Sequence, residues 1–301
     1  MIEYSCKLEK INHRGLMMKN IVFIGDSITD GGTYPSIVEA FAIAGGILEY
    51  DFINLGVSSE NTSGLTEEGH PFPRPNILNR IDRITSLVEG EWATVMYGEN
   101  DGIYQPFSQK RFELYKKGIT EVVEKLHKAG FKVALITPTP FDPVSFTGSL
   151  SCEEQVPFGS VCADYDKVME TYANWILSCG LADKVIDVRT PLKAYLDLRR
   201  KDRPNFKTGD GIHQGEEGNY IIASQVLKSL FGIDIGTYNE TPLPYIYKYV
   251  KKKSGYTHRF YKEFIGHENP YKEKKISQSK FISKKKKYID KISEALGAGK
   301  R

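Results

Sequence analysis

Short apolar runs alternate with amphipathic stretches between residues 20 and 235. Five of these runs are continuous and rich in Val and Ile: Ile21–Ile24, Phe52–Leu55, Ala93–Tyr97, Val133–Thr137 and Val185–Val188. Continuous runs of this kind are typical of strands that are buried on both faces. The pattern therefore predicts five strands of a parallel sheet.

The segments between the runs carry apolar residues three or four positions apart, as on one face of a helix. Three such series include Ile77, Ile81 and Ile84; Ile119, Val122 and Leu126; and Ile222, Val226 and Leu230. Strands that alternate with helices need right-handed crossovers, which place helices on both faces of the sheet. We expect an α/β fold, a three-layer α/β/α sandwich around a five-stranded parallel sheet. The periodicity does not determine the strand order, for which we expect 2-1-3-4-5.

The character of the chain changes after residue 235, where prolines and then aromatic and basic residues dominate. We divide the chain into an N-terminal extension, a main domain, an appended helical segment that packs on it and a basic flexible tail, covering residues 1–19, 20–235, 236–270 and 271–301. In the appended segment we expect one or two short helices between Tyr245 and Ile265, broken at Gly255.

The net charge of +3 conceals an asymmetry along the chain. Residues 248–301 carry 17 Lys and Arg against 5 Asp and Glu, so the remainder is acidic. A lysine-rich end is usually solvated and flexible, and we expect no nucleic-acid partner. Apolar residues around Lys284–Lys287 have a rough helical spacing, so the alternative is a basic helix in weak electrostatic contact with an anionic surface.

The cysteines and the N-terminal region bear on the compartment. No apolar run has the length of a membrane span, and residues 1–20 do not read as a secretory signal. The four cysteines follow no metal-binding spacing, so we expect reduced thiols, a cytoplasmic location and no metal. Cys152 and Cys162 flank one loop and could pair only in an oxidising compartment.

Small and polar residues follow the predicted strands. Gly-Asp-Ser-Ile-Thr at 25–29 follows the first, Gly56 follows the second, and Gly-Glu-Asn-Asp at 98–101 follows the third. Asp-Gly-Ile-His at 210–213 lies in a glycine-rich loop after the fifth strand and its helix. Because ligands bind beyond the carboxyl ends of parallel strands, we expect these segments to converge on one rim.

Ser27, His213 and Asp210 have the residue types of a nucleophilic triad. A serine hydroxyl needs an adjacent base to react at neutral pH. Of the six histidines, His213 is the one in a predicted strand-end loop with a carboxylate at short, fixed spacing. Asp210 precedes it by three residues, so one turn can place the carboxylate against the imidazole and fix its tautomer. We predict Ser27 as nucleophile, His213 as base and Asp210 as the orienting group.

Acyl transfer also needs hydrogen-bond donors for the oxyanion that forms on the substrate. The candidates are the backbone N–H groups of Ser27 and Gly56 and the side-chain amide of Asn100. Glycine at position 56 would let the backbone approach the substrate closely.

Other residues near these blocks have structural interpretations. Asp26 is more typical of a turn or a helix cap than of an acid catalyst, and we interpret Asp30 and Asp101 as carboxylates that hold loops. Tyr97 and Tyr104 fit either a substrate cleft or the core, and the sequence does not distinguish the two.

The four blocks, in this order and at this spacing, resemble those of the SGNH hydrolase family, which contains the GDSL esterases and lipases. One block alone is a weak signal, but together they span most of residues 20–232. The resemblance implies that four residues give the family its name and a fifth completes the triad: Ser27, Gly56, Asn100 and His213, with Asp210. It also implies a flavodoxin-like sheet and no metal or organic cofactor. Gln214 departs from the pattern, since many relatives carry proline after the histidine.

Together these features predict a serine esterase that hydrolyses a small acyl ester, such as an acetylated carbohydrate or a short-chain lipid. The main alternative is a transacylase that passes the acyl group to a sugar hydroxyl. A second alternative is a non-catalytic carbohydrate-binding protein, because a fold does not establish a function. A phosphate-binding loop is disfavoured because Asp26 and Asp30 would place negative charge beside the phosphate.

Overall fold

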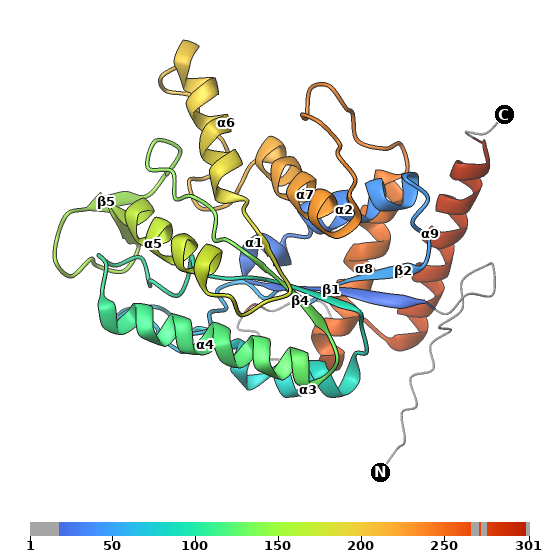
Figure 1. The fold of residues 1–301 in the computed structure, drawn as a ribbon, viewed down its shortest axis with the longest axis horizontal. Helices are drawn as coiled ribbons and strands as arrows, with labels where there is room; N and C mark the ends of the chain where they lie inside the picture. The colour runs from blue at the N-terminus through green and yellow to red at the C-terminus, as the bar shows by residue number, and fades with distance from the viewer. Residues whose placement is uncertain (1–17, 266–270, 272–275, 299–301) are drawn as a thin grey trace.

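A five-stranded parallel sheet forms the centre of the molecule (Figure 1). The computed structural model describes residues 18–265, 271 and 276–298, and its central strands have the order β2-β1-β3-β4-β7. Their bounds are β1 (Lys19–Gly25), β2 (Tyr50–Asn54), β3 (Trp92–Met96), β4 (Lys132–Ile136) and β7 (Lys184–Ile186). The five predicted strands and the order 2-1-3-4-5 are confirmed. Most of the predicted N-terminal extension, at 1–17, lies outside the described residues.

Helices cover both faces of this sheet, as predicted (Figure 1). One layer contains α3 (Ile81–Leu87), α4 (Gln109–Lys128) and α5 (Tyr165–Ser178), and the other contains α2 (Thr33–Ala44), α6 (Arg189–Asp202) and α7 (Glu216–Phe231). Alternate residues of a strand serve the two layers: Val22 and Ile24 belong to the first core, and Ile21 and Phe23 to the second. Burial on both faces explains why each strand reads as a continuous apolar run.

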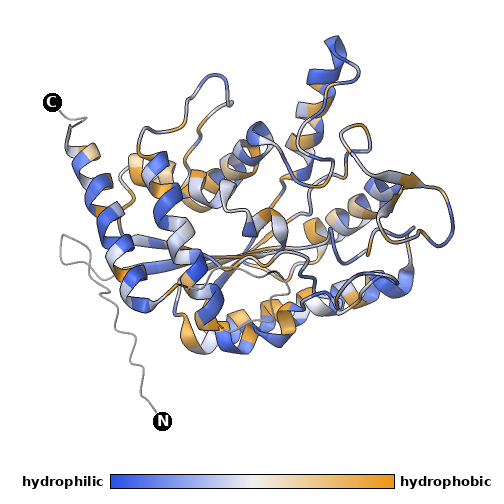
Figure 2. Cartoon of the chain, turned by 180° about the vertical axis from the view of Figure 1, so that it is seen from behind, coloured by the Kyte–Doolittle hydropathy of each residue, from blue (hydrophilic) through white to orange (hydrophobic). Residues whose placement is uncertain are grey.

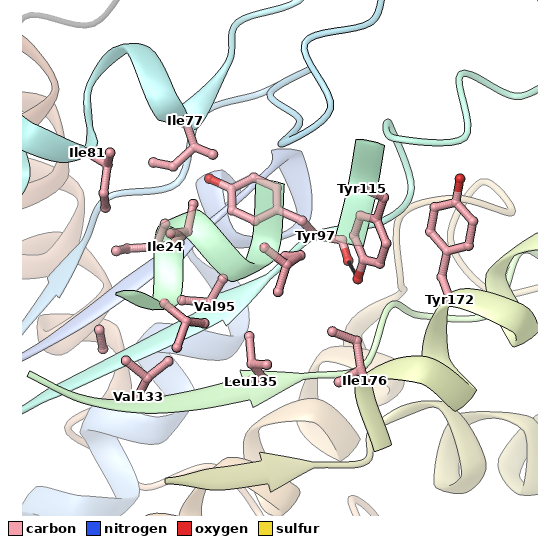
Figure 3. Packing of buried hydrophobic residues seen from close by; sticks show 14 of the residues in the cluster. Ile24, Ile77, Ile81, Val95, Tyr97, Tyr115, Val133, Leu135, Tyr172 and Ile176 are labelled. Carbon is pink, nitrogen blue, oxygen red and sulfur yellow. Dashed lines mark hydrogen bonds between the residues drawn. The ribbon is translucent and has the colours of Figure 1, made fainter. Parts of the chain in front are cut away.

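The core under α3–α5 contains several tyrosines (Figure 3). The rings of Tyr115 and Tyr172 stack with centroids 4.5 Å apart. The Tyr115 hydroxyl donates a hydrogen bond of 3.1 Å to the carbonyl of Tyr97, at the end of β3. A buried tyrosine hydroxyl needs such a partner, so the core itself anchors the loop that follows β3.

Two short elements and a small second sheet complete the main domain. The nucleophile candidate lies in the one-turn helix α1 (Ser27–Asp30), and η1 (Ile77–Asn79) is a 3₁₀ turn before α3. Strands β5 (Ser149–Ser151) and β6 (Ser160–Cys162) pair with each other in a segment between β4 and α5. These two strands were not predicted, because their residues do not form a continuous apolar run. Cys152 and Cys162 are free thiols in this segment.

The C-terminal segment forms two helices, α8 (Tyr247–Ile265) and α9 (Gln278–Ala298). We predicted a break at Gly255, and this is wrong, because α8 runs through it without interruption. A glycine inside a helix lowers its stability by only about 1 kcal/mol. The packing of α8 against α2, β2 and α9 stabilises the helix by more than that.

The prediction of a flexible tail over residues 271–301 is also wrong for the part that the structure describes. Phe281 of α9 is 1% exposed and stacks on Phe260 of α8 with ring centroids 4.2 Å apart. Tyr288 and Ile292 are buried on the same helix, most of whose other residues are hydrophilic (Figure 2). The few apolar residues of this segment lie on one face of a helix, so they bury enough surface to order it.

A lysine of α9 forms an ion pair with the central sheet. Lys285, in the four-lysine run, pairs with Asp51 of β2, and the buried Lys253 of α8 contacts the same carboxylate at 3.0 Å. No helix in the described part of the chain combines the length and the hydrophobicity that a membrane span requires.

We expect Phe281→Ala to lower the free energy of unfolding by about 3–5 kcal/mol, since it leaves a cavity between α8 and α9. The matched control is Ile282→Ala, because Ile282 is 43% exposed on the same helix and its truncation should change stability by about 0.5 kcal/mol. Urea denaturation of both variants measures the difference. Equal losses would show that α9 does not pack as described.

Candidate active site

The structure brings Ser27, His213 and Asp210 together at the carboxyl end of the sheet. The Oγ of Ser27 lies 2.7 Å from Nε2 of His213, and Nδ1 of His213 lies 2.8 Å from Oδ2 of Asp210. A carboxylate only accepts hydrogen bonds, so Nδ1 carries the proton and Nε2 is free to accept the serine hydroxyl. This is the arrangement in which an imidazole can remove a proton from serine.

Asp210 is held in its ionised form by donors from its own loop. Partial burial acts to raise the pKa of Asp210, but hydrogen bonds from the His213 side chain and from the backbone N–H groups of His213 and Ile212 outweigh it and lower the pKa. The two N–H groups donate to Oδ1 at 2.7 and 3.0 Å. A single tight turn therefore fixes both the charge and the direction of the carboxylate.

The loop that carries Asp210 is attached to the segment after β4. Gly211 has φ 93°, and a Cβ there would lie 2.7 Å from the backbone of both Asp142 and Phe146. The N–H of Asp142 donates to the carbonyl of Gly211 at 2.8 Å, and the Asp142 carboxylate pairs with Arg200 at 2.6 Å. Glycine is needed at this position because the two backbones meet without room for a side chain.

Ser27 is positioned by the turn between β1 and α1. Asp26 caps α1, because its Oδ1 accepts the N–H of Ile28 at 3.0 Å. This agrees with its interpretation as a cap residue. Ser27 is the first residue of α1, so its own N–H has no acceptor within the helix, and it has none elsewhere among the described residues.

The amide of Asn100 has one defined orientation. Its oxygen accepts from Nη1 of Arg74 at 2.8 Å and from the hydroxyl of Tyr104 at 3.1 Å, while its nitrogen donates to the carbonyl of Glu60 at 3.1 Å. An arginine side chain has no acceptor, so the atom that faces it must be the amide oxygen. The second N–H of Asn100 has no acceptor among the residues that the structure describes.

Sequence reasoning missed Arg74. This side chain is 8% exposed and forms two hydrogen bonds to Glu67, the longer of them 2.6 Å, in addition to its bond to Asn100. A guanidinium bound to the amide oxygen holds Asn100 in place and polarises its N–H groups. One sequence feature could have identified Arg74. It lies between prolines in a loop, where a charged residue is usually exposed and has no fixed partner.

Gly56 does not act as we predicted. Its backbone N–H donates to Oδ1 of Asn54 at 2.8 Å and is already satisfied. A Cβ at this position would lie 2.4 Å from the backbone nitrogen of Asp30. Glycine at position 56 therefore allows the loop after β2 to pack closely against α1. Gly56 is not the oxyanion donor on this loop.

The open backbone donor on the loop is Ser59. Every other N–H between residues 55 and 61 has an acceptor, whereas that of Ser59 has none in the part of the chain that the structure describes. Ser59 also has φ 64°, in the left-handed region that non-glycine residues seldom adopt. Such strained backbone is concentrated at functional sites.

Helix α8 also contacts the turn that carries Ser27. The carboxylate of Asp30 is 2.6 Å from Nε2 of His258 and 2.5 Å from Nζ of Lys262, and it also accepts the N–H of Ser58 at 3.0 Å. Nδ1 of His258 is 2.7 Å from the carbonyl of Asn54. His258 therefore bridges Asp30 and the backbone of the β2 strand end. Asp30 holds loops, as interpreted, but its partners come from a distant helix.

Two other acids lie buried near Ser27 and have raised pKa values. Burial raises the pKa of Asp26 to about 7 despite the hydrogen bond from Ile28. Burial, together with the nearby Asp26, raises the pKa of Glu99 well above its usual range. Asp101 differs from these two acids in its hydrogen bonds. Its Oδ1 accepts three of them from Thr62 and Ser63, and these bonds hold the loops together, as interpreted.

Among the residues that the structure covers, no group of three or more His, Cys, Asp or Glu side chains is arranged to hold a metal ion. The side chains of the site at the surface are accessible, since His213 and Asp210 are 47% and 48% exposed.

Comparison with known proteins agrees with this geometry. Residues 23–221 match the profile of the GDSL-like lipase/acylhydrolase family, and the chain belongs to that family. It is an SGNH-type hydrolase that acts on ester bonds. None of the curated proteins compared matches the sequence.

Solved structures with low sequence identity share the fold. A variant of an acetyl xylan esterase from Geobacillus stearothermophilus has 17% identity and a TM-score of 0.54, covering 72% of this chain and 96% of its own. A second acetyl xylan esterase has 22% identity and a TM-score of 0.52, covering 70% and 100%. A gut microbial diltiazem-metabolizing enzyme has 17% identity and a TM-score of 0.51, covering 70% of this chain and 46% of its own.

The raised pKa of Asp26 predicts a pH-dependent stability. A buried acid whose pKa rises to about 7 stabilises the fold while it is protonated, and this contribution is lost as the pH rises through 7. Asp26→Asn keeps the cap oxygen without the charge. We expect the variant to exceed the parent in unfolding free energy by up to about 4 kcal/mol at pH 8.5 and by little at pH 4. Urea denaturation at both pH values measures this, and a pH-independent difference would contradict it.

Proposed function

We propose that Ser27, His213 and Asp210 hydrolyse a small acyl ester through an acyl-enzyme. The observation that carries the proposal is the continuous chain of hydrogen bonds from Ser27 to Asp210, at 2.7 and 2.8 Å. His213 takes the proton of Ser27 as the oxygen attacks the carbonyl carbon, and then gives that proton to the leaving alcohol. Water, activated by the same imidazole, cleaves the acyl-enzyme and releases the acid.

The oxyanion of the tetrahedral intermediate needs donors that are in place before the reaction. We assign this role to the side-chain N–H of Asn100 and to the backbone N–H groups of Ser27 and Ser59. The support for Asn100 is its fixed orientation against Arg74, and that for the two backbone groups is that neither donates within the described structure. Asp210 remains charged and stabilises the imidazolium that forms.

An acetylated carbohydrate and a short-chain lipid are the substrate classes that we infer for this site. Two of the structural neighbours are named acetyl xylan esterases, and the half-exposed imidazole of His213 leaves the site accessible to a substrate group on a larger molecule. Transfer of the acyl group to a sugar hydroxyl instead of water uses the same groups and is the second candidate. Product analysis with a sugar acceptor distinguishes the two.

Ser27→Ala is expected to abolish ester hydrolysis while the protein stays folded, because no other group replaces the nucleophile. A fluorophosphonate probe should label Ser27, and the labelling should disappear in His213→Ala, since the hydroxyl then has no base. Peptide mapping by mass spectrometry locates the label, and circular dichroism checks the fold. A label on another serine, or undiminished labelling without His213, would exclude the proposed triad.

Asn100→Ala is expected to lower kcat by roughly 10²–10³-fold with a smaller change in KM, because the oxyanion exists mainly in the transition state. Steady-state kinetics on a short-chain nitrophenyl ester provide both constants. If KM rises and kcat is unchanged, Asn100 binds the substrate and is not an oxyanion donor.

A further inference from the structure

A cavity of about 160 Å³ lies beside the groups that would flank the ester. Its lining includes Tyr104, whose hydroxyl contacts the amide oxygen of Asn100 at 3.1 Å, and Ile212, the residue before His213. The cavity is therefore bordered on one side by a neighbour of the oxyanion donor and on another by a neighbour of the base. We therefore expect a substituent of an ester bound at Ser27 to reach it.

The cavity offers mainly apolar surface. Its apolar side chains include Ile103, Phe146, Val156, Phe158, Val161 and Ile212. Its polar side chains are largely engaged elsewhere: Glu67 pairs with Arg74, and both amide atoms of Gln105 bond to the backbone of Val156, at 2.7 and 2.8 Å. A sugar ring needs free hydrogen-bonding groups for its hydroxyls, whereas this lining suits a hydrocarbon.

One wall of the cavity is strained. Ile103 and Tyr104 have φ values of 47° and 56°, and a β-branched residue at positive φ is a marked outlier. The strained pair is held by the segment that contains β5 and β6, because the N–H of Cys162 donates to the carbonyl of Tyr104 at 2.9 Å. Strain that the surrounding structure maintains in this way is typical of ligand sites.

The other wall comes from the same segment. The loop between β5 and β6 and the start of β6 contribute residues 156–161 to the lining. This segment forms no part of the central sheet and holds none of the triad residues. Its contacts indicate instead that it encloses the cavity.

We propose that the cavity binds an apolar group of the ester, of about the size of a benzene ring or a chain of about six carbons. A cavity of roughly 150 Å³ lined by aliphatic and aromatic side chains is enough to hold benzene. The inference rests on the function proposed above and narrows its substrate class to esters that carry such a group on the acyl or the alcohol side. An acetyl group on a small alcohol leaves the cavity empty.

Two pairs of esters test the inference with the full-length protein. Ethyl hexanoate against ethyl acetate varies the acyl side, and benzyl acetate against ethyl acetate varies the alcohol side, with acid release as the readout. We expect kcat/KM to rise at least tenfold in one of the two comparisons, and that comparison identifies the side that occupies the cavity. Ratios near one in both comparisons would overturn the inference.

Three variants connect the preference to the cavity. Val161→Phe adds a larger side chain inside the cavity and should lower the ratio of kcat/KM for the preferred ester to that for ethyl acetate at least fivefold. The control is Leu150→Phe, because Leu150 is 44% exposed on β5 and lies outside the lining, and it should leave this ratio unchanged. Phe146→Ala enlarges the cavity and should shift the preference toward ethyl octanoate or a bulkier alcohol, which keeps the test decisive if Val161→Phe does not fold. Equal effects of Val161→Phe and Leu150→Phe would overturn the assignment.

The outcomes also separate this inference from the function on which it rests. Hydrolysis that requires Ser27 but shows no size preference contradicts the cavity assignment alone. Hydrolysis of all three esters that persists in Ser27→Ala contradicts the proposed triad, and the cavity assignment with it.

Discussion

Buried polar side chains hold the loops at the carboxyl edge of the sheet, because a buried polar group without a hydrogen-bond partner destabilises the fold. Glu60 pairs with Arg80 at 2.6 Å and accepts the hydroxyl of Tyr97, and Arg74 connects Glu67 to Asn100. The partners come from different loops, so satisfying one group fixes two segments relative to each other. The amide of Asn100, the proposed oxyanion donor, is the last member of this network, and its orientation follows from its contacts with Arg74 and the Glu60 carbonyl.

Differences in burial also give the acids around Ser27 different pKa values, and so different states of ionisation. Asp26 and Glu99 lie in the interior and have raised pKa values, whereas Asp210 lies in a half-exposed turn with several donors and has a lowered one. Negative charge is therefore concentrated on the carboxylate that contacts the imidazole of His213. In the proposed mechanism, this charge would stabilise the imidazolium of His213.

The C-terminal helices belong to the structure of the catalytic domain. Helix α8 places His258 and Lys262 on Asp30, three residues after Ser27. Its buried Lys253 pairs with Glu39 of α2 at 2.6 Å and with Asp51 of β2. Such buried ion pairs require both partners, since removing one leaves an unpaired charge in the interior. Helix α9 covers α8 through Phe281, so the two helices stabilise the turn that carries Ser27 from outside the sheet.

The sequence by itself predicted the five strands, three of the helices of the main domain and the meeting of Ser27, Asp210 and His213 at one edge of the sheet. Strand burial leaves a local pattern, and the parallel sheet brings the segments after its strands to one edge. Only the tertiary structure decided that Gly56 packs against α1, that Arg74 orients Asn100 and that α9 is ordered. Each of these depends on contacts between segments far apart in the chain, which no periodicity records. A residue's partner across the fold is set by packing, and the packing exists only once the chain has folded.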